Sequence, residues 1–393
     1  MHPAVRRSRG TVLAATATLG LLLAGCGSDG AGDGGPIKRV LIGAAISTSG
    51  PAAFAGVPVE QGIELAVKQA NDEAALGEGV ELDLEVVDVA ADPAAAIAAY
   101  RQFDNDGAAG VLCCTLGSEA GALRPVMSQS LTPGVVTVSI LEGLANPPHL
   151  FRPFEVPSNP GGIYDKFLDA VLSGSDFSTA VIVVNDDNDA MVQDSRVYAD
   201  ALERNGVRIL DTVNAGTAET SFTSVATGIV ANKPDVVVAS TIGSSTAALA
   251  RSLRERGYDR PIVSNVGADS APAYEASAGQ MEGTIFPTPY HADFPVNDAG
   301  GAFAEDYEAA YGSKPDMFAA HGYTAAQMLI TAIADAESHD PDDVGAALSA
   351  LTGMQSVYGE LEFADGQAQV QDPARHLVWG AGGAITEWNP SAS

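Results

Sequence analysis

The chain has 393 residues, and its 50 acidic residues against 20 Lys and Arg give a formal net charge of −30. This balance argues against a nucleic-acid partner, because phosphate binding needs clustered Lys and Arg. The length exceeds one typical domain and predicts two. Three cysteines are too few for a disulfide framework, so an ordinary apolar core must hold the fold together.

The first 25 residues have the organisation of an export signal. A basic start containing Arg6 and Arg7 precedes an apolar stretch over 11–24, which is shorter than the roughly 20 residues that a membrane-spanning helix needs. The stretch ends in Leu-Ala-Gly-Cys, which resembles the bacterial lipobox, so Cys26 is predicted to carry a lipid that anchors the mature chain to a membrane. Residues 26–36 are rich in Gly and small polar residues and predict a flexible tether.

Beyond residue 39, short β-branched runs alternate with longer amphipathic stretches. This pattern predicts an α/β fold made of doubly wound parallel sheets flanked by helices. In the first series the predicted strands are Val40–Ile46, 80–86, Ala109–Cys113 and Val135–Ser139, with a helix ending at about Asn71 and others beginning at Asp92-Pro93 and at Ser118.

Five prolines within residues 146–160 mark a change of domain. A second, similar series follows, with predicted helices Ile163–Leu172, Val192–Asn205, Phe222–Ala231 and Thr246–Arg256 and strands Ala180–Val184, Val207–Thr212, Val236–Ala239, Ile262–Ser264 and Gly283–Phe286. Helices over 299–312, 317–338 and 343–352 then lead to a hairpin-like tail with turns at Gly359, Gly366 and Gly383. Two such lobes predict a cleft between them, and ligands of open α/β sheets bind beyond the carboxyl ends of the strands.

Cys113 and Cys114 are adjacent on an apolar strand. Because adjacent cysteines oxidise only to a strained eight-membered ring, two buried thiols are the favoured interpretation. Their oxidation state stays open at this point.

The sequence carries no signature of an enzyme or of a metal site. It lacks the Gly-x-Ser-x-Gly, Ser-x-x-Lys, Gly-x-Gly-x-x-Gly and His-Glu-x-x-His patterns. The acidic run over 186–189 fails the EF-hand pattern because Ala190 and Met191 interrupt it. We therefore expect a protein without catalytic residues, cofactor or bound metal.

The chain resembles a known family from its first predicted strand onward. Residues 42–51 (IGAAISTSGP), followed by Gly56 and residues 61–66 (QGIELA), are similar to the type I periplasmic binding proteins of the branched-chain amino-acid (Leu/Ile/Val) type, the solute receptors of ABC importers. Later markers are Asp88, Asp92-Pro93, Gly117-Ser118, Ser221-Phe222, Gly257, Glu282-Gly283, residues 323–326 (YTAA), Tyr358-Gly359 and Phe363.

The resemblance implies two lobes joined by three chain crossings. Lobe I would comprise residues 37–154 and 290–357, and lobe II residues 155–289 and 358–390. The implied function is that of an extracytoplasmic lipoprotein that captures a small amino acid, amide or carboxylate and delivers it to the permease of an ABC importer. We expect the protein to be a monomer. A ligand-sensing module for a membrane signalling partner is the alternative, and a cell-envelope enzyme is a remote one.

In lobe I, Gly117 and Ser118 open a helix after a strand, where free N–H groups and the helix dipole stabilise an anion. The resemblance assigns Ser118 to a ligand carboxylate, a role compatible with that of an N-cap. It also assigns Ser139, with Leu141 after it, to a second anchoring loop. Phe54 would form an aromatic wall, or would be a surface aromatic.

In lobe II the sequence departs from the family pattern. Residues 185–191 (NDDNDAM), which include the candidate Asn188, replace the family's Tyr-Gly pair, and Ile242 stands where an aromatic is usual. The acid that pairs with a ligand ammonium is missing near Val266, with Asp269 close by. Either Asp187, Asp189 or Asp269 replaces it, or the ligand has no α-amino group, because an unpaired buried ammonium is costly.

Overall fold

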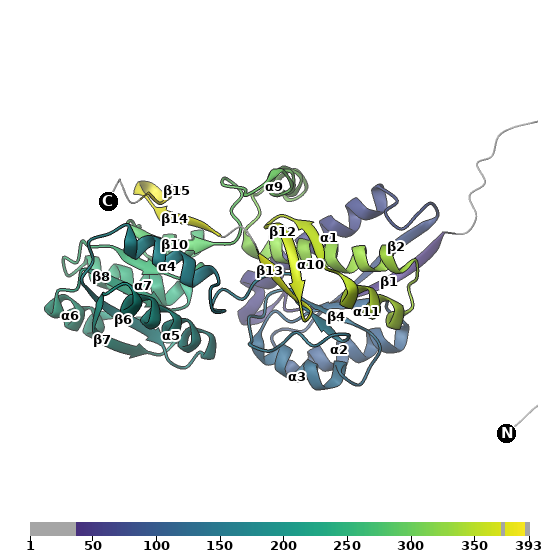
Figure 1. The fold of residues 1–393 in the computed structure, drawn as a ribbon, viewed down its shortest axis with the longest axis horizontal. Helices are drawn as coiled ribbons and strands as arrows, with labels where there is room; N and C mark the ends of the chain where they lie inside the picture. Colours follow the sequence, from purple (N-terminus) through teal and green to yellow (C-terminus); the bar gives the residue numbers. More distant parts are fainter. Residues whose placement is uncertain (1–36, 371–373, 390–393) are drawn as a thin grey trace, which may run out of the picture. The chain divides into compact units, whose positions relative to one another are not determined.

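Residues 37–370 and 374–389 are described by the structure, a computed structural model, and they include two large β-sheets (Figure 1). The predicted signal over 1–25, the tether over 26–36 and the lipidation site Cys26 lie outside the described residues. The first sheet has five parallel strands in the order β2-β1-β3-β4-β5. Its strands are β1 (Lys38–Ile46), β2 (Val80–Asp88), β3 (Gly110–Cys113), β4 (Gly134–Val136) and β5 (Leu150–Phe151).

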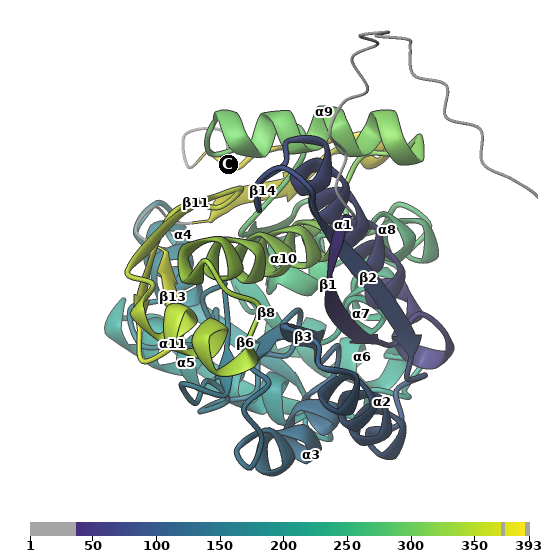
Figure 2. The ribbon, with the colours of Figure 1, turned by 90° about the vertical axis from the view of Figure 1, so that its right-hand side faces the viewer.

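Helices from two distant parts of the chain cover the first sheet. One layer contains α1 (Ala53–Asp72), α10 (Met317–Ala336) and α11 (Pro341–Ala350), and the other contains α2 (Pro93–Asp106) and α3 (Gly117–Met127). In Figures 1 and 2 these two layers lie on opposite faces of the strands. Helix α9 (Asp298–Tyr311) packs on α1 through Tyr307, whose hydroxyl donates to Gln61.

Glycines let α1 and α10 approach closely. A methyl group added at Gly62 would lie 2.1 Å from the carbonyl oxygen of Ala319, and one at Gly322 would lie 2.2 Å from that of Val59. Neither position has room for a side chain. The two backbones can therefore touch, and Ile63 and Leu329 on these helices belong to the core of the first sheet.

The second sheet has seven strands in the order β15-β14-β10-β9-β8-β6-β7. Strands β6 to β10 run parallel, and the C-terminal strands β14 and β15 add an antiparallel edge. The strands are β6 (Thr179–Asn185), β7 (Arg208–Ala215), β8 (Val236–Ser240), β9 (Ile262–Ser264), β10 (Thr284–Thr288), β14 (Arg375–Trp379) and β15 (Ile385–Glu387).

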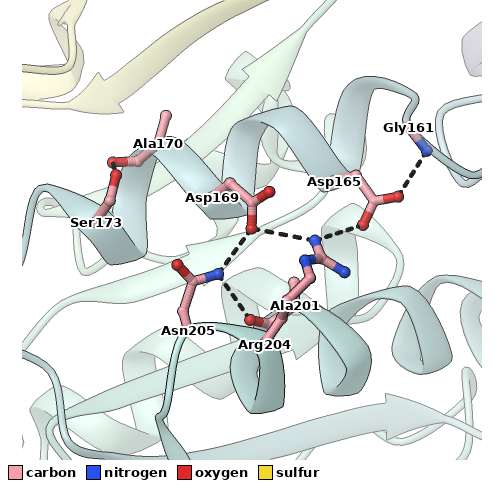
Figure 3. Close-up of polar contacts among 8 residues, drawn as sticks. All are labelled: Gly161, Asp165, Asp169, Ala170, Ser173, Ala201, Arg204 and Asn205. Carbon is pink, nitrogen blue, oxygen red and sulfur yellow. Dashed lines mark hydrogen bonds and ion pairs between the residues drawn. The ribbon is translucent and has the colours of Figure 1, made fainter.

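Two helical layers also enclose the second sheet. Helices α4 (Ile163–Ser173) and α5 (Asp189–Arg204) share one core, and α6 (Thr223–Asn232), α7 (Gly243–Arg254) and the short α8 (Ala271–Ala276) share the other. On the solvent side, Arg204 of α5 donates to Asp165 and Asp169 of α4, and Asn205 donates to Asp169 (Figure 3). This network fixes α5 against α4.

The chain passes between the two sheets three times: after β5, after β10, and after β13.

The third of these passages comes later in the sequence than predicted. Strands β11 (Gly353–Ser356), β12 (Gly359–Ala364) and β13 (Gln367–Val370) form a separate antiparallel sheet, and Leu361 and Ala368 pack in the core of the first sheet. Residues 358–370 therefore belong with lobe I, and the predicted boundary at 357 is corrected to the segment after β13.

The sequence missed the short strand β5 and the helix α8, and it extended β4 too far. The predicted strand Val135–Ser139 ends at Val136. Its neighbour Cys114 has a φ of 77°, a left-handed conformation that turns the chain out of the sheet. Regular pairing therefore cannot continue to Ser139.

Cys113 and Cys114 form a disulfide. The favoured interpretation of two buried thiols is thus wrong about their oxidation state, although both residues are fully buried as expected. Among the described helices, none combines the length and the apolar character that crossing a membrane requires.

Candidate functional site

The loop after β1 is tied to the beginning of α3 by buried polar groups. Ser47 is fully buried, and its hydroxyl donates to Glu119 over 2.5 Å. The second carboxylate oxygen of Glu119 accepts the N–H of Leu116 at 3.0 Å. Glu119 therefore caps its own helix and holds the first loop against it, a role indicated by an acid in the third position of a helix.

Ser118 is exposed in the first turn of α3. The N-cap is Leu116, two residues earlier, so the alternative role of Ser118 as an N-cap is wrong. The N–H groups of the first turn are those that a helix leaves without internal partners, and they carry the positive end of its dipole. An exposed hydroxyl beside such N–H groups suits a carboxylate or another anion.

The structure brings the second predicted loop to the beginning of α3. A methyl group at Gly117 would lie 3.9 Å from Oγ of Ser139 and 3.9 Å from Cβ of Leu141. Ser139 is buried, whereas Leu141 is partly exposed. Gly117, Ser139 and Leu141 are therefore neighbours, and Ser118 is next to them in the chain.

The backbone at the end of β3 positions this second loop. The carbonyl oxygen of Cys114 accepts the N–H of Ser139 at 2.9 Å, and that of Cys113 accepts both the N–H and the hydroxyl of Thr137. The residues that hold Ser139 thus come from the end of β3, directly before α3. Both parts of the candidate site are built on this one strand end.

Phe54 lies elsewhere. It is 69% exposed near the start of α1 and packs edge-on against Phe318 at the start of α10, with the ring centroids 5.6 Å apart. The structure thus gives Phe54 a partner on α10 and leaves most of its ring exposed, and its role as an aromatic wall stays a prediction.

The predicted residues of the second sheet share one edge. Asn188 follows β6, Ile242 follows β8 and Asp269 follows β9, and these three strands are neighbours. Asn188 is the N-cap of α5 and accepts the N–H groups of Ala190 and Met191. The N–H of Ile242 donates to Oδ1 of Asn185 at 2.9 Å. Asn188 and the backbone of Ile242 therefore have structural roles.

The three acids considered for a ligand ammonium differ in their surroundings. Asp187 accepts the N–H and the hydroxyl of Thr217, so it fastens two loops together. Asp189 is exposed in the first turn of α5. Burial raises the pKa of Asp269 to about 7, with Thr288 and Asp316 as neighbours. Asp269 is partly buried, and burial favours the protonated form of its carboxyl.

Asp194 was not predicted from the sequence, yet it is the most deeply buried acid at this edge. It lies on α5, is 0% exposed, and faces Ser158, Tyr164 and Asn265. Burial raises its pKa to about 7. Its spacing on α5, three residues after Met191 and four before Tyr198, places it on the buried face and was the available signal.

Comparisons with known proteins all give binding proteins. A family model described as "Periplasmic binding protein" matches residues 39–384. The Leu/Ile/Val-binding protein homolog 1 of Brucella melitensis biotype 1 is 23% identical over 346 residues, which cover 82% of this chain and 86% of the relative. The leucine-binding protein LivK of Thermotoga maritima superposes with a TM-score of 0.78 at 20% identity, over 89% of this chain and 98% of that one. The branched-chain amino-acid transporter substrate-binding protein LivJ of Streptococcus pneumoniae, in complex with isoleucine, gives 0.77 at 18% identity, over 89% and 99%.

Proposed function

Because the chain belongs to the periplasmic binding protein family, whose model matches residues 39–384, we propose that it captures a small carboxylate or amide solute for an ABC importer. Members of this family bind solutes and are not enzymes, and the same holds for this chain. The ligand class and the importer are the proposed parts of the function.

One observation carries the proposal for the ligand. Gly117 at the beginning of α3 lies against Ser139 and Leu141, with Ser118 exposed beside them. Helix N–H groups, a dipole end and two hydroxyls gather at the carboxyl edge of a parallel sheet, where such sheets bind ligands. A carboxylate, or the carbonyl of an amide, satisfies these donors.

The second lobe supplies the other half of the proposed site. In our proposal, residues 37–154 and 290–370 form one lobe, residues 155–289 and the strands after 374 form the other, and the ligand bridges them. Asp269 and its neighbours at the edge of the second sheet would meet the ligand in the closed form. A ligand favours closure only by binding the closed form more tightly, so it must contact both lobes.

We also propose that a lipid on Cys26 holds the protein at the outer face of the cell membrane, beside its permease. Two or more acyl chains are enough for stable anchoring, and the sequence over 26–36 suits a tether. The mass of the N-terminal peptide from the membrane fraction tests this, since an unmodified Cys26 would contradict the anchor.

A thermal-shift screen identifies the ligand class. Small carboxylates, amino acids, amides and aromatic acids are compared, because a tight ligand raises the apparent stability by mass action. We expect at least one to raise the melting temperature of the full chain. If none of the panel does so, the proposed function is contradicted.

Ser118→Trp tests the location of the site. We expect the dissociation constant of the ligand from that screen to rise by about tenfold or more, because the indole would occupy the space beside the helix N–H groups. Ser128→Trp is the matched control, since Ser128 is exposed at the other end of α3. Equal affinities of the two variants, measured by calorimetry, would place the ligand elsewhere.

A further inference from the structure

Arg152 lies behind the second loop of the candidate site. It follows β5, and only 3% of its surface is exposed. Its Nη1 donates to the carbonyl oxygens of Ser139 at 3.1 Å and Leu141 at 3.0 Å, and its Nε donates to Oε1 of Gln367. The guanidinium therefore holds the loop in place from its buried side.

The charge of Arg152 has no acidic partner. Within 37–370 and 374–389, no carboxylate forms an ion pair with it, whereas the more exposed Arg204 and Arg260 pair with aspartates. Burial lowers the pKa of Arg152 to about 10, so the group is still charged at neutral pH. In a chain of net charge −30, a buried cation bonded to neutral oxygens is a considerable cost to stability.

On one side, Arg152 faces uncharged rings. Its guanidinium lies 5.9 Å from the centre of the Phe154 ring, and His321 packs against that same ring. Burial lowers the pKa of His321 to about 3, so this histidine is neutral. Of these three side chains, Arg152 is therefore the one that carries a charge at neutral pH.

The backbone of the loop is oriented by these hydrogen bonds. The carbonyls of Ser139 and Leu141 point toward Arg152. In a trans peptide unit the N–H is opposite to the carbonyl, so the N–H groups of Ile140 and Glu142 point away from Arg152. The loop thus presents positive dipole ends on the side opposite the guanidinium, and the beginning of α3 lies beside it at Gly117.

The geometry points to Arg152 as the residue that makes this site selective for ligands bearing a carboxylate over their neutral amides. The inference rests on the proposed function and deepens it. Arg152 is a positioning residue: it acts through the oriented loop and through its uncompensated charge, without contacting the ligand. In the described part of the chain, no side chain forms an ion pair with the Arg152 guanidinium, so a bound carboxylate would supply the opposite charge. Because Arg152 is buried, solvent screens the attraction between these two charges only weakly.

The test compares matched carboxylate and amide pairs on the full chain: L-isoleucine with L-isoleucinamide, benzoate with benzamide, and acetate with acetamide. The readout is the ratio of the two affinities within a pair, from calorimetry or thermal shift at constant ionic strength. A loss of folding alone would weaken both members of a pair equally, so it leaves this ratio unchanged.

Four variants give the comparison. Arg152→Gln is expected to lower the carboxylate-to-amide ratio by about tenfold, and Arg152→Lys to retain most of it. Gln367→Glu keeps Arg152 but places a carboxylate at its Nε, and it is expected to lower the ratio as well. Arg254→Gln is the control, because Arg254 also donates to carbonyl oxygens, those of Tyr258, Arg260 and Glu282, but at the end of α7, among the helices of the second sheet.

The outcomes separate this inference from the proposed function. A wild-type ratio near one in every pair, or an unchanged ratio in both Arg152→Gln and Gln367→Glu, overturns the role of Arg152. If neutral probes still bind in that case, the proposed function stands. If no probe binds the wild type at all, both are overturned.

Discussion

At the residue scale, the disulfide between Cys113 and Cys114 is the feature that most changes the interpretation of the site. It sits where β3 ends, and the carbonyl of Cys114 holds the N–H of Ser139. We expect the peptide that contains both cysteines to be lighter by the two hydrogens lost on oxidation, and to resist alkylation until it is reduced, since a disulfide has no thiol to react. Mass spectrometry of the denatured protein, alkylated with and without prior reduction, measures this. Alkylation of both thiols without a reductant would contradict the assignment.

At the scale of elements, the contact between α1 and α10 depends on Gly62 and Gly322. Gly322→Ala would bring a methyl group to 2.2 Å from the carbonyl oxygen of Val59, which is backbone and cannot rotate away. We expect a loss of about 1–3 kcal/mol in the free energy of unfolding, measured by chemical denaturation. Gly228→Ala on α6 is the control: nothing lies within 4 Å of its added methyl group, so a small gain in stability is expected there. If both substitutions changed the free energy of unfolding by the same amount, the close contact between α1 and α10 would not contribute to stability.

At the scale of the whole molecule, buried acids make stability depend on pH. Burial raises the pKa of Glu155, Asp194 and Asp269 to about 7, whereas carboxyls of the unfolded chain titrate near about 4. The folded state thus holds protons that the unfolded state has lost, so this stabilisation is complete below about pH 4 and is lost as the pH rises to about 7. We expect the melting temperature to fall between about pH 4 and about pH 7, with a smaller fall in Asp194→Asn. Asp200→Asn, an exposed acid on the same helix, should match the wild type.

Local pattern determined much of this protein from the sequence alone. Alternation of β-branched runs with amphipathic stretches located most strands and helices, because side-chain periodicity is a property of neighbouring residues. The glycine and serine at the start of α3 marked a helix beginning after a strand, and the resemblance assigned that position to a ligand carboxylate. Local pattern did not predict the boundary after β13, because Leu361 and Ala368 pack in the core of the first sheet against residues far away in the chain.

Only the tertiary structure decided which groups share the site. Arg152 lies outside every motif, and its importance comes from the carbonyls of Ser139 and Leu141 and from the absence of an ion pair within the described residues. Asp194 likewise looks like any acid on an amphipathic helix until its burial is known. Sequence determines local conformation because neighbouring residues set it, whereas burial and charge balance depend on distant segments that meet only in the folded chain.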